Sequence, residues 1–186
     1  QEIQAVLSGS LNFIFNNFDE NISFYEVVKK AGEAGYTEPD PRIDLSGVDV
    51  MRKILILVRE SGVKMELSDI ENVSFLPISS QKAITVDDFM RPLISDADHF
   101  NELRKKASEK GCKLKFVAEF NRGKAKVGLK EIPAGHPFYN LDGKDNIVLF
   151  HTNRYTDQPL IIKGAGAGAE VTASGMFADI IRTINK

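Results

Sequence analysis

A run of alternating apolar and polar residues over residues 112–129 places the strongest constraint on the fold. Apolar side chains stand at every second position from Cys112 to Phe120, and mostly charged residues stand between them. This period of two is typical of a β-strand with one buried face. Residues 121–124 read Asn-Arg-Gly-Lys, which is typical of a turn, and the alternation then continues to Leu129. These residues therefore predict a β-hairpin.

Helical patterns flank the hairpin on both sides. Ser23 and Glu26 form a capping-box pattern that opens a helix, and Gly35 is expected to follow its end. We expect helices over residues 11–18, 23–34, 46–60, 96–110 and 171–184, and strands over residues 112–120, 125–129, 146–152 and 160–163. Helices that cover a mixed, largely antiparallel sheet make an α+β fold, and we expect residues 1–186 to form one domain.

The composition limits the classes of function. Of the 186 residues, 42% are hydrophobic and 27% are charged, which is typical of a soluble globular protein. The net charge of -2 gives no basic field for nucleic acid or anionic lipid, and no apolar run approaches the ~20 residues of a membrane span. A single cysteine, Cys112, excludes an intrachain disulfide and a multi-thiolate zinc site. We expect a cytoplasmic protein with no metal site and no nucleic-acid or membrane partner.

A proline-bearing loop and the helix after it carry most of the candidate chemistry. Glu38, Asp40 and Asp44 lie within residues 36–44, where two prolines are expected to prevent helix formation. On the following helix, Asp49 and Lys53 are four residues apart and therefore lie on one face. The pattern places four carboxylates and one lysine near one helix N-terminus.

This acidic cluster has a structural and a functional interpretation. Ser46 and Asp49 have the spacing of a capping box, and Asp49 with Lys53 has the spacing of a surface ion pair worth only ~0.3–0.5 kcal/mol. Spacing alone favours this structural interpretation. However, crowded carboxylates repel one another unless a cation lies among them. A bound ammonium group beside Lys53 would supply that charge, so the cluster also indicates an amino-acid site.

Residues 35–53, Gly-Tyr-Thr-Glu-Pro-Asp-Pro-Arg-Ile-Asp-Leu-Ser-Gly-Val-Asp-Val-Met-Arg-Lys, resemble the signature of homoserine dehydrogenases. Residues 8–15, 164–173 and 177–181 support the resemblance, which covers essentially the whole chain and is strongest to the form fused to an aspartokinase. The resemblance implies an oxidoreductase that uses NADP or NAD to interconvert L-aspartate 4-semialdehyde and L-homoserine, in the biosynthesis of threonine and methionine. It also implies a catalytic domain similar to that of glyceraldehyde-phosphate dehydrogenases, and a homodimer formed through the sheet.

The resemblance also implies roles for individual residues. Lys53 matches the lysine that donates a proton to the carbonyl oxygen, and Asp49 matches its carboxylate partner. The position of Ser10 commonly holds threonine in the family, and serine keeps the hydroxyl. The residues that match substrate-binding positions are Glu38, Tyr36, Asp44, Gly9 and Ser10. A second lysine of the family pattern belongs to the dinucleotide-binding domain and is not in this chain.

Residues 163–170, Lys-Gly-Ala-Gly-Ala-Gly-Ala-Glu, resemble a dinucleotide fingerprint only superficially. No second parallel strand with an acidic residue follows them, so by themselves they predict a tight turn before the last helix. The family resemblance places this segment at a domain junction and implies that Gly168 contacts the cofactor. The helix N-terminus expected near Val171 could also present free N–H groups to an anion, so Thr172 is a candidate for either a helix cap or a contact with a cofactor phosphate. We expect the chain to be a fragment, without the N-terminal Rossmann domain and inactive by itself.

Two other functions are compatible with the same sequence. The first is a non-catalytic amino-acid-binding or dimerisation module that has kept the fold. The second is another semialdehyde dehydrogenase, which would use Cys112 as its nucleophile. Cys112 has no base near it in the sequence, so a structural role is favoured for this residue.

Overall fold

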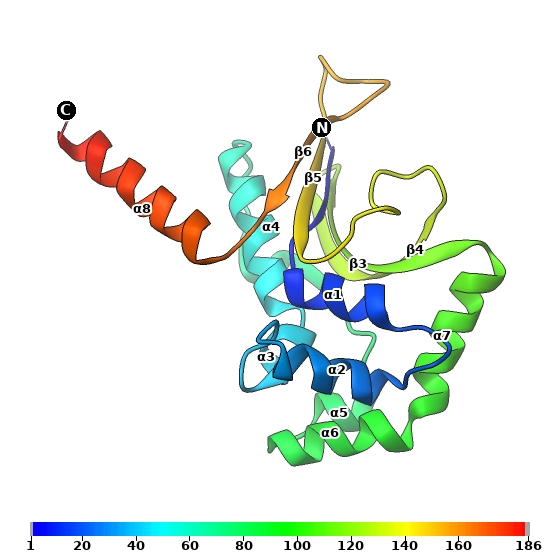
Figure 1. Ribbon diagram of the computed structural model, residues 1–186. Helices are drawn as coiled ribbons and strands as arrows, with labels where there is room; N and C mark the ends of the chain where they lie inside the picture. Colours follow the sequence, from blue (N-terminus) through cyan, green and yellow to red (C-terminus); the bar gives the residue numbers. More distant parts are fainter. Residues whose placement is uncertain (1, 185–186) are drawn as a thin grey trace.

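The predicted hairpin lies inside a six-stranded sheet in the computed structural model, which describes residues 2–184 (Figure 1). Its first strand is β3 (Cys112–Asn121) and its second is β4 (Lys124–Pro133). The other elements, in chain order, are β1 (Glu2–Val6), α1 (Gly9–Asn17), α2 (Phe24–Glu33), α3 (Pro41–Leu45), α4 (Val48–Glu60), the 3-10 helix η1 (Leu67–Asp69), β2 (Ile70–Val73), α5 (Ile78–Gln81), α6 (Val86–Ser95), α7 (Ala97–Glu109), β5 (Asp145–His151), β6 (Leu160–Ala165) and α8 (Ala169–Ile184).

The strand order across the sheet is β2-β4-β3-β1-β5-β6. Only β2 and β4 are parallel, and every other neighbouring pair is antiparallel. The hairpin register pairs Cys112 with Pro133 and Asn121 with Lys124. The predicted α+β class and the mixed, largely antiparallel sheet are therefore confirmed. Strand β1 lies between β3 and β5, a central position that the sequence pattern did not predict.

Strand β3 is buried on both faces, so the prediction of a half-buried strand was wrong. All residues from Leu114 to Ala118 are buried. Leu114 and Phe116 belong to the large core cluster, to which helices α1, α2, α4, α6 and α7 also contribute. Val117 points to the opposite face, where it packs in a second cluster with Phe138 and Leu141 from the connection between β4 and β5. That connection covers the face which the alternation had assigned to solvent.

Lys115 lies at the centre of this doubly covered strand and is fully buried, with 0% of its surface exposed. Its Nζ donates hydrogen bonds to Asn12 Oδ1 (2.8 Å), Asn16 Oδ1 (2.6 Å) and the carbonyl oxygen of Leu141 (2.6 Å). Burial lowers the pKa of Lys115 to about 8. Because its three acceptors come from α1 and from the β4–β5 connection, Lys115 joins both segments to the sheet.

The segment before α4 corrects two predictions. Residues 36–44 were expected to contain no helix, but α3 begins at Pro41, where the missing N–H of proline costs no hydrogen bond. The side chain of Asp40 caps this helix by accepting from the backbone N–H of Arg42 (3.0 Å). The capping box expected from Ser46 is also absent, because Ser46 ends α3 and Gly47 is the N-cap of α4.

The other predicted helices form close to their expected bounds. The capping box of α2 is complete, with both of its reciprocal hydrogen bonds between Ser23 and Glu26. The sequence analysis did not assign β1, β2, α5 or α6. Figure 1 shows α8 extending away from the sheet and from the other helices, and none of its described residues is buried. Within residues 2–184, no helix has the length and apolar character needed to cross a membrane.

Replacing Lys115 with methionine should remove a pH dependence of stability. Folding lowers the pKa of Lys115 from 10.5 to about 8, so between these values the unfolded chain binds more protons. The stability of the unsubstituted protein should therefore rise with pH in this window, by at most about 1.4 kcal/mol per pH unit. Lys115→Met should lack this slope. At about pH 7 its free energy of unfolding should be lower by about 1–3 kcal/mol for each side-chain oxygen left without a donor.

Urea unfolding of both proteins between about pH 7 and about pH 10 measures this difference. Parallel stability profiles would show that Lys115 keeps an ordinary pKa in the folded protein.

Candidate active site

A cavity of about 610 Å³ brings together segments that are distant in the sequence. Its walls come from the start of α1, the loop after α2, α3, α4, the β4–β5 connection and the turn before α8. The lining residues are Ser8, Gly9, Ser10, Ala34, Gly35, Tyr36, Thr37, Glu38, Asp44, Asp49, Lys53, Lys144, Ala167 and Gly168. All of the residues to which the family resemblance or the helix N-terminus assigned a role are among them except Thr172, and Asp40 of the acidic cluster is also absent.

Lys53 lies on α4 and is held by two acceptors. Its Nζ is 2.7 Å from Asp49 Oδ2 and donates to the carbonyl oxygen of Leu7 at 3.0 Å. The side chains are 38% and 48% exposed, so the ion pair itself contributes at most about 1 kcal/mol to stability. An ammonium group has three donors, and two of them are engaged here. No residue between 2 and 184 accepts from the third, which is left for an acceptor in the cavity.

Asp44 joins the start of α1 to the loop after α2. Its Oδ1 accepts from the hydroxyl of Ser10 (2.7 Å), and its Oδ2 accepts from the backbone N–H of Glu38 (2.9 Å). These bonds fix the positions of two residues that line the cavity. Within the described part of the chain, the exposed carboxylate of Glu38 has neither an ion pair nor a hydrogen bond, so it can accept from a bound ammonium group.

Tyr36 forms an aromatic part of the wall. Its ring stacks on Phe13 of α1, with ring centroids 4.1 Å apart and an interplanar angle of 24°. The backbone N–H of Tyr36 donates to the carbonyl oxygen of Ala31 at the end of α2 (2.8 Å). The stacking and the backbone bond hold the loop that carries Glu38 against α1 and α2.

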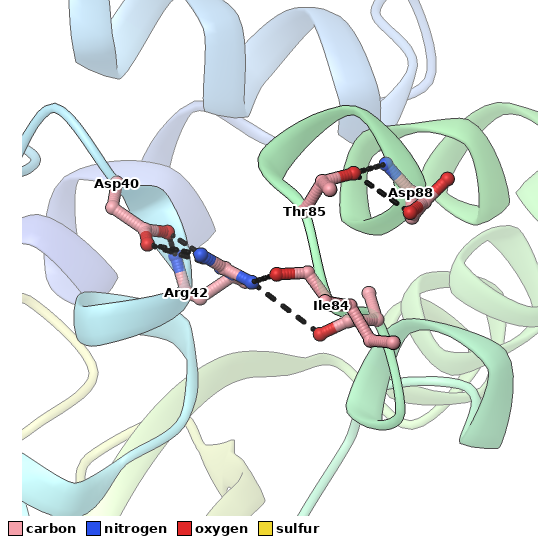
Figure 2. Close-up of polar contacts among 6 residues, drawn as sticks. Asp40, Arg42, Ile84, Thr85 and Asp88 are labelled. Atoms are coloured by element: carbon pink, nitrogen blue, oxygen red, sulfur yellow. Dashed lines mark hydrogen bonds and ion pairs between the residues drawn. The ribbon is translucent and has the colours of Figure 1, made fainter.

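Asp40 does not belong to the cavity, although the sequence grouped it with the other carboxylates. Its oxygens accept hydrogen bonds from the guanidinium of Arg42, and this holds the pKa of Asp40 below its ordinary value. Arg42 Nη1 also donates to the carbonyl oxygens of Ile84 (2.6 Å) and Ala83 (3.3 Å), immediately before the Thr85–Asp88 cap of α6 (Figure 2). Arg42 thus fastens α3 to the segment between α5 and α6.

The glycine-rich turn reaches the cavity through Ala167 and Gly168. Thr172 is the fourth residue of α8, and its backbone N–H donates to the carbonyl oxygen of Gly168 (2.9 Å). Thr172 therefore lies in the first turn and is not the N-cap, because α8 begins at Ala169 rather than near Val171. Its contact with a cofactor remains a prediction.

The sequence analysis missed Lys144, Ser8 and Thr37 among the polar lining residues. Thr37 lies inside the recognised motif, and Ser8 begins a supporting segment, so both were close to known signals. Lys144 lies in the β4–β5 connection, far from every motif, and only the folding of the chain brings it to the cavity.

Cys112 lies outside this cavity. Its Sγ donates weakly to the carbonyl oxygen of Lys110 (3.6 Å), and it lines a separate hollow of about 410 Å³ together with Asp19, Arg104 and other residues. This position disfavours a mechanism with Cys112 as the nucleophile. Among residues 2–184, no group of three or more histidine, cysteine or carboxylate side chains is arranged to hold a metal ion.

Comparison with known proteins places this geometry in context. The model of the homoserine dehydrogenase family matches residues 1–181. The chain is 48% identical over 182 residues to the chloroplastic bifunctional aspartokinase/homoserine dehydrogenase 1 of Zea mays, covering 97% of this chain and 20% of that protein. It is 39% identical over 193 residues to the homoserine dehydrogenase of Schizosaccharomyces pombe, covering 100% of this chain and 51% of that protein. The chain thus spans about a fifth to about half of these relatives.

Solved structures have the same fold. A Candida auris protein of unknown function superposes with a TM-score of 0.91 at 37% sequence identity, covering 100% of this chain and 54% of the other. A homoserine dehydrogenase from Thiobacillus denitrificans superposes with a TM-score of 0.75 at 28% identity, covering 97% of this chain and 38% of the other.

Replacing Gly47 with alanine should destabilise the corner between α3, which carries Asp44, and α4, which carries Lys53. Gly47 has φ +76°, and a Cβ there would lie 2.7 Å from Phe116 Cζ in the core. We expect a loss of about 2–4 kcal/mol in the free energy of unfolding, from backbone strain and overpacking together. Gly62→Ala is the matched control, because Gly62 has φ +86° with no atom within 4 Å of the added Cβ.

Urea unfolding of both variants separates the two effects. An equal loss for Gly47→Ala and Gly62→Ala would show that the contact with Phe116 has no energetic cost.

Proposed function

We propose that this chain, which belongs to the homoserine dehydrogenase family, supplies the substrate-binding and catalytic part of an NAD(P)-dependent enzyme that interconverts L-aspartate 4-semialdehyde and L-homoserine. One observation carries the proposal. The Lys53 ammonium group, held by Asp49 and the Leu7 carbonyl, lines the same cavity as the free carboxylate of Glu38 and the glycine-rich turn. This cavity combines a proton donor, an acceptor for a substrate ammonium group and a backbone turn open to a second ligand.

Lys53 is proposed to act on the substrate oxygen. NAD(P)H, when bound, would supply the hydride for reduction of the aldehyde, and NAD(P)+ would accept it in the reverse direction. As hydride reaches the carbonyl carbon, negative charge develops on oxygen, and an ammonium group within hydrogen-bond reach stabilises that charge and delivers a proton. In the oxidation of homoserine, the lysine amine takes the hydroxyl proton back. Asp49 and the Leu7 carbonyl engage two of the three N–H donors, which leaves one for the substrate.

The substrate is proposed to lie between Glu38 and the start of α1. Glu38 would accept hydrogen bonds from the substrate ammonium group, because its carboxylate is exposed and has no partner within residues 2–184. Gly9 and Ser10 also line the cavity, and the bond from Ser10 to Asp44 fixes the hydroxyl there. Tyr36 closes one side of the cavity. This match between opposite charges favours a substrate with an ammonium group, such as an amino-acid aldehyde, over an uncharged aldehyde.

The glycine-rich turn is proposed to contact the cofactor. Ala167 and Gly168 place only backbone and a methyl group at the cavity, which leaves room for a ligand to approach the chain closely. We propose Gly168 as a backbone contact and Thr172, one turn into α8, as a more distant one. Since the turn lacks the rest of a dinucleotide fingerprint, most contacts to NAD(P) would come from another part of the parent protein. The chain alone is therefore expected to be inactive.

Exposed apolar side chains on β6 and α8 support the proposal that this chain packs against other protein surfaces. Edge strand β6 exposes Leu160, Ile161 and Ile162, with 41%, 46% and 57% of their surfaces accessible, and this supports a homodimer formed through the sheet. Helix α8 exposes Phe177 and Ile180, which would pack against the dinucleotide-binding part of the parent protein. Fusion to an aspartokinase and a cytoplasmic location remain predictions.

Lys53→Met in the full-length protein should lower kcat/KM for L-homoserine by about 10²–10⁴-fold, the usual contribution of a general acid or base. The fold should survive, because Lys53 is partly exposed and its ion pair is weak. Asp49→Asn should cause a smaller loss, since the Leu7 carbonyl still holds the lysine. Steady-state kinetics together with circular dichroism provides the measurement.

Full activity in a folded Lys53→Met variant would remove the proposed proton donor. If the unsubstituted full-length protein bound homoserine without turnover, a non-catalytic amino-acid-binding module would be favoured instead.

A further inference from the structure

The charged groups that line the cavity are unequally engaged. Asp49 is paired with Lys53, and both oxygens of Asp44 accept hydrogen bonds. The carboxylate of Glu38 and the ammonium group of Lys144 form no ion pair or side-chain hydrogen bond with any residue between 2 and 184. Two lining residues of opposite charge are therefore left for a ligand.

An α-amino acid presents the complementary pair of charges. It carries one ammonium group and one carboxylate at neutral pH, and each is stabilised by an opposite charge near it. Glu38 is suited to the ammonium group. Lys53 already has two acceptors, and its remaining donor is assigned to the reacting oxygen. Lys144 is thus the cation that remains for the carboxylate.

The segment that carries Lys144 is fixed to α1. Asn12, which is buried on α1, donates from Nδ2 to the carbonyl oxygens of Gly143 (2.9 Å) and Leu141 (3.3 Å). The Leu141 carbonyl also accepts from buried Lys115 (2.6 Å). These bonds hold the backbone on the N-terminal side of Lys144, so this lysine extends from an anchored segment although its own side chain is exposed.

Gly9 allows this segment to reach the cavity wall. A Cβ at position 9 would lie 3.0 Å from the carbonyl oxygen of Lys144 and 3.3 Å from its Cβ. A larger residue would push the two segments apart. The missing side chain therefore lets the backbone of Lys144 pack directly against the start of α1, next to Ser10 in the chain. Among the described lining residues, Lys144 is the only cation without an ion pair.

We propose that Lys144 binds the carboxylate of the amino-acid substrate and makes the site selective for substrates in which this carboxylate is free. The inference rests on the proposed function, because it concerns the same cavity. It adds a recognition group that lies outside every sequence motif of the chain. Lys144 is a binding residue in this proposal and takes no part in proton transfer.

The test uses the full-length enzyme with two substrates, L-homoserine and L-homoserinamide, in which a neutral amide replaces the carboxylate. Lys144→Met removes the charge, and Lys144→Arg keeps it. Lys64→Met is the matched control, since Lys64 is exposed, has no ion pair within the described residues and lies outside the cavity. Steady-state kinetics gives KM and kcat for each substrate, and calorimetric titration with L-homoserine gives a binding constant that does not depend on turnover.

We expect Lys144→Met to raise the KM and Kd for L-homoserine about 10-fold, typical of a charged hydrogen bond at an exposed site, with kcat within about two-fold of the unsubstituted enzyme. Lys144→Arg should restore most of the affinity, and Lys64→Met should change nothing. For L-homoserinamide, Lys144→Met should have little effect, because the group that it recognises is missing.

Three results would overturn the inference: an unchanged Kd for L-homoserine in Lys144→Met, an equal loss for both substrates, or a change confined to the KM for NAD(P). The last result would assign the lysine to a cofactor phosphate. Failure of the proposed function is a separate outcome, because the unsubstituted enzyme would then not turn over L-homoserine, and the calorimetric comparison would still decide the role of Lys144.

Discussion

The buried ammonium group of Lys115 organises this fold around a polar contact inside its core. A fully buried lysine is costly unless its donors are satisfied, and here three oxygens from two segments satisfy them. The same contact attaches α1 and the β4–β5 connection to the central strand of the sheet. Both segments also line the cavity, α1 through Gly9 and Ser10 and the β4–β5 connection through Lys144. The arrangement of the site thus depends on a contact that lies outside it.

Backbone carbonyl groups help to hold several cationic side chains of this protein in place. The Leu7 carbonyl accepts from Lys53 and, at 3.4 Å, from Asn146, while the carbonyls of Ile84 and Leu141 hold Arg42 and Lys115. A carbonyl acceptor fixes a cationic side chain and leaves its positive charge unneutralised. At Lys53 the Leu7 carbonyl adds to the ion pair with Asp49 and helps to fix the ammonium group, whose proposed role requires a positive charge directed at the substrate oxygen.

Much of the fold could be predicted from the sequence, because its signals are local. The hairpin, the antiparallel sheet and the capping box of α2 follow from periods and spacings within short windows. Predictions failed either where a local rule was applied too broadly or where tertiary contacts overrode it. Pro41 starts a helix because Asp40 caps it, and Lys115 is buried because α1 and the β4–β5 connection supply its acceptors. Strand β1 was not assigned from the sequence pattern, and pairing on both of its edges defines it.

The sequence by itself determined the family motif and, through it, the residues from Tyr36 to Lys53 that share one wall of the cavity. These residues are close in the chain, so one short loop and two adjoining helices bring them together. Only the tertiary structure decided that Asp40 turns away to Arg42, that Thr172 lies beyond the lining residues, and that Lys144 joins the site. For Thr172 and Lys144 the physical reason is that sequence spacing does not specify which distant segments meet in space. For Asp40 it is that spacing groups the neighbouring carboxylates without specifying which of them Arg42, two residues away, engages.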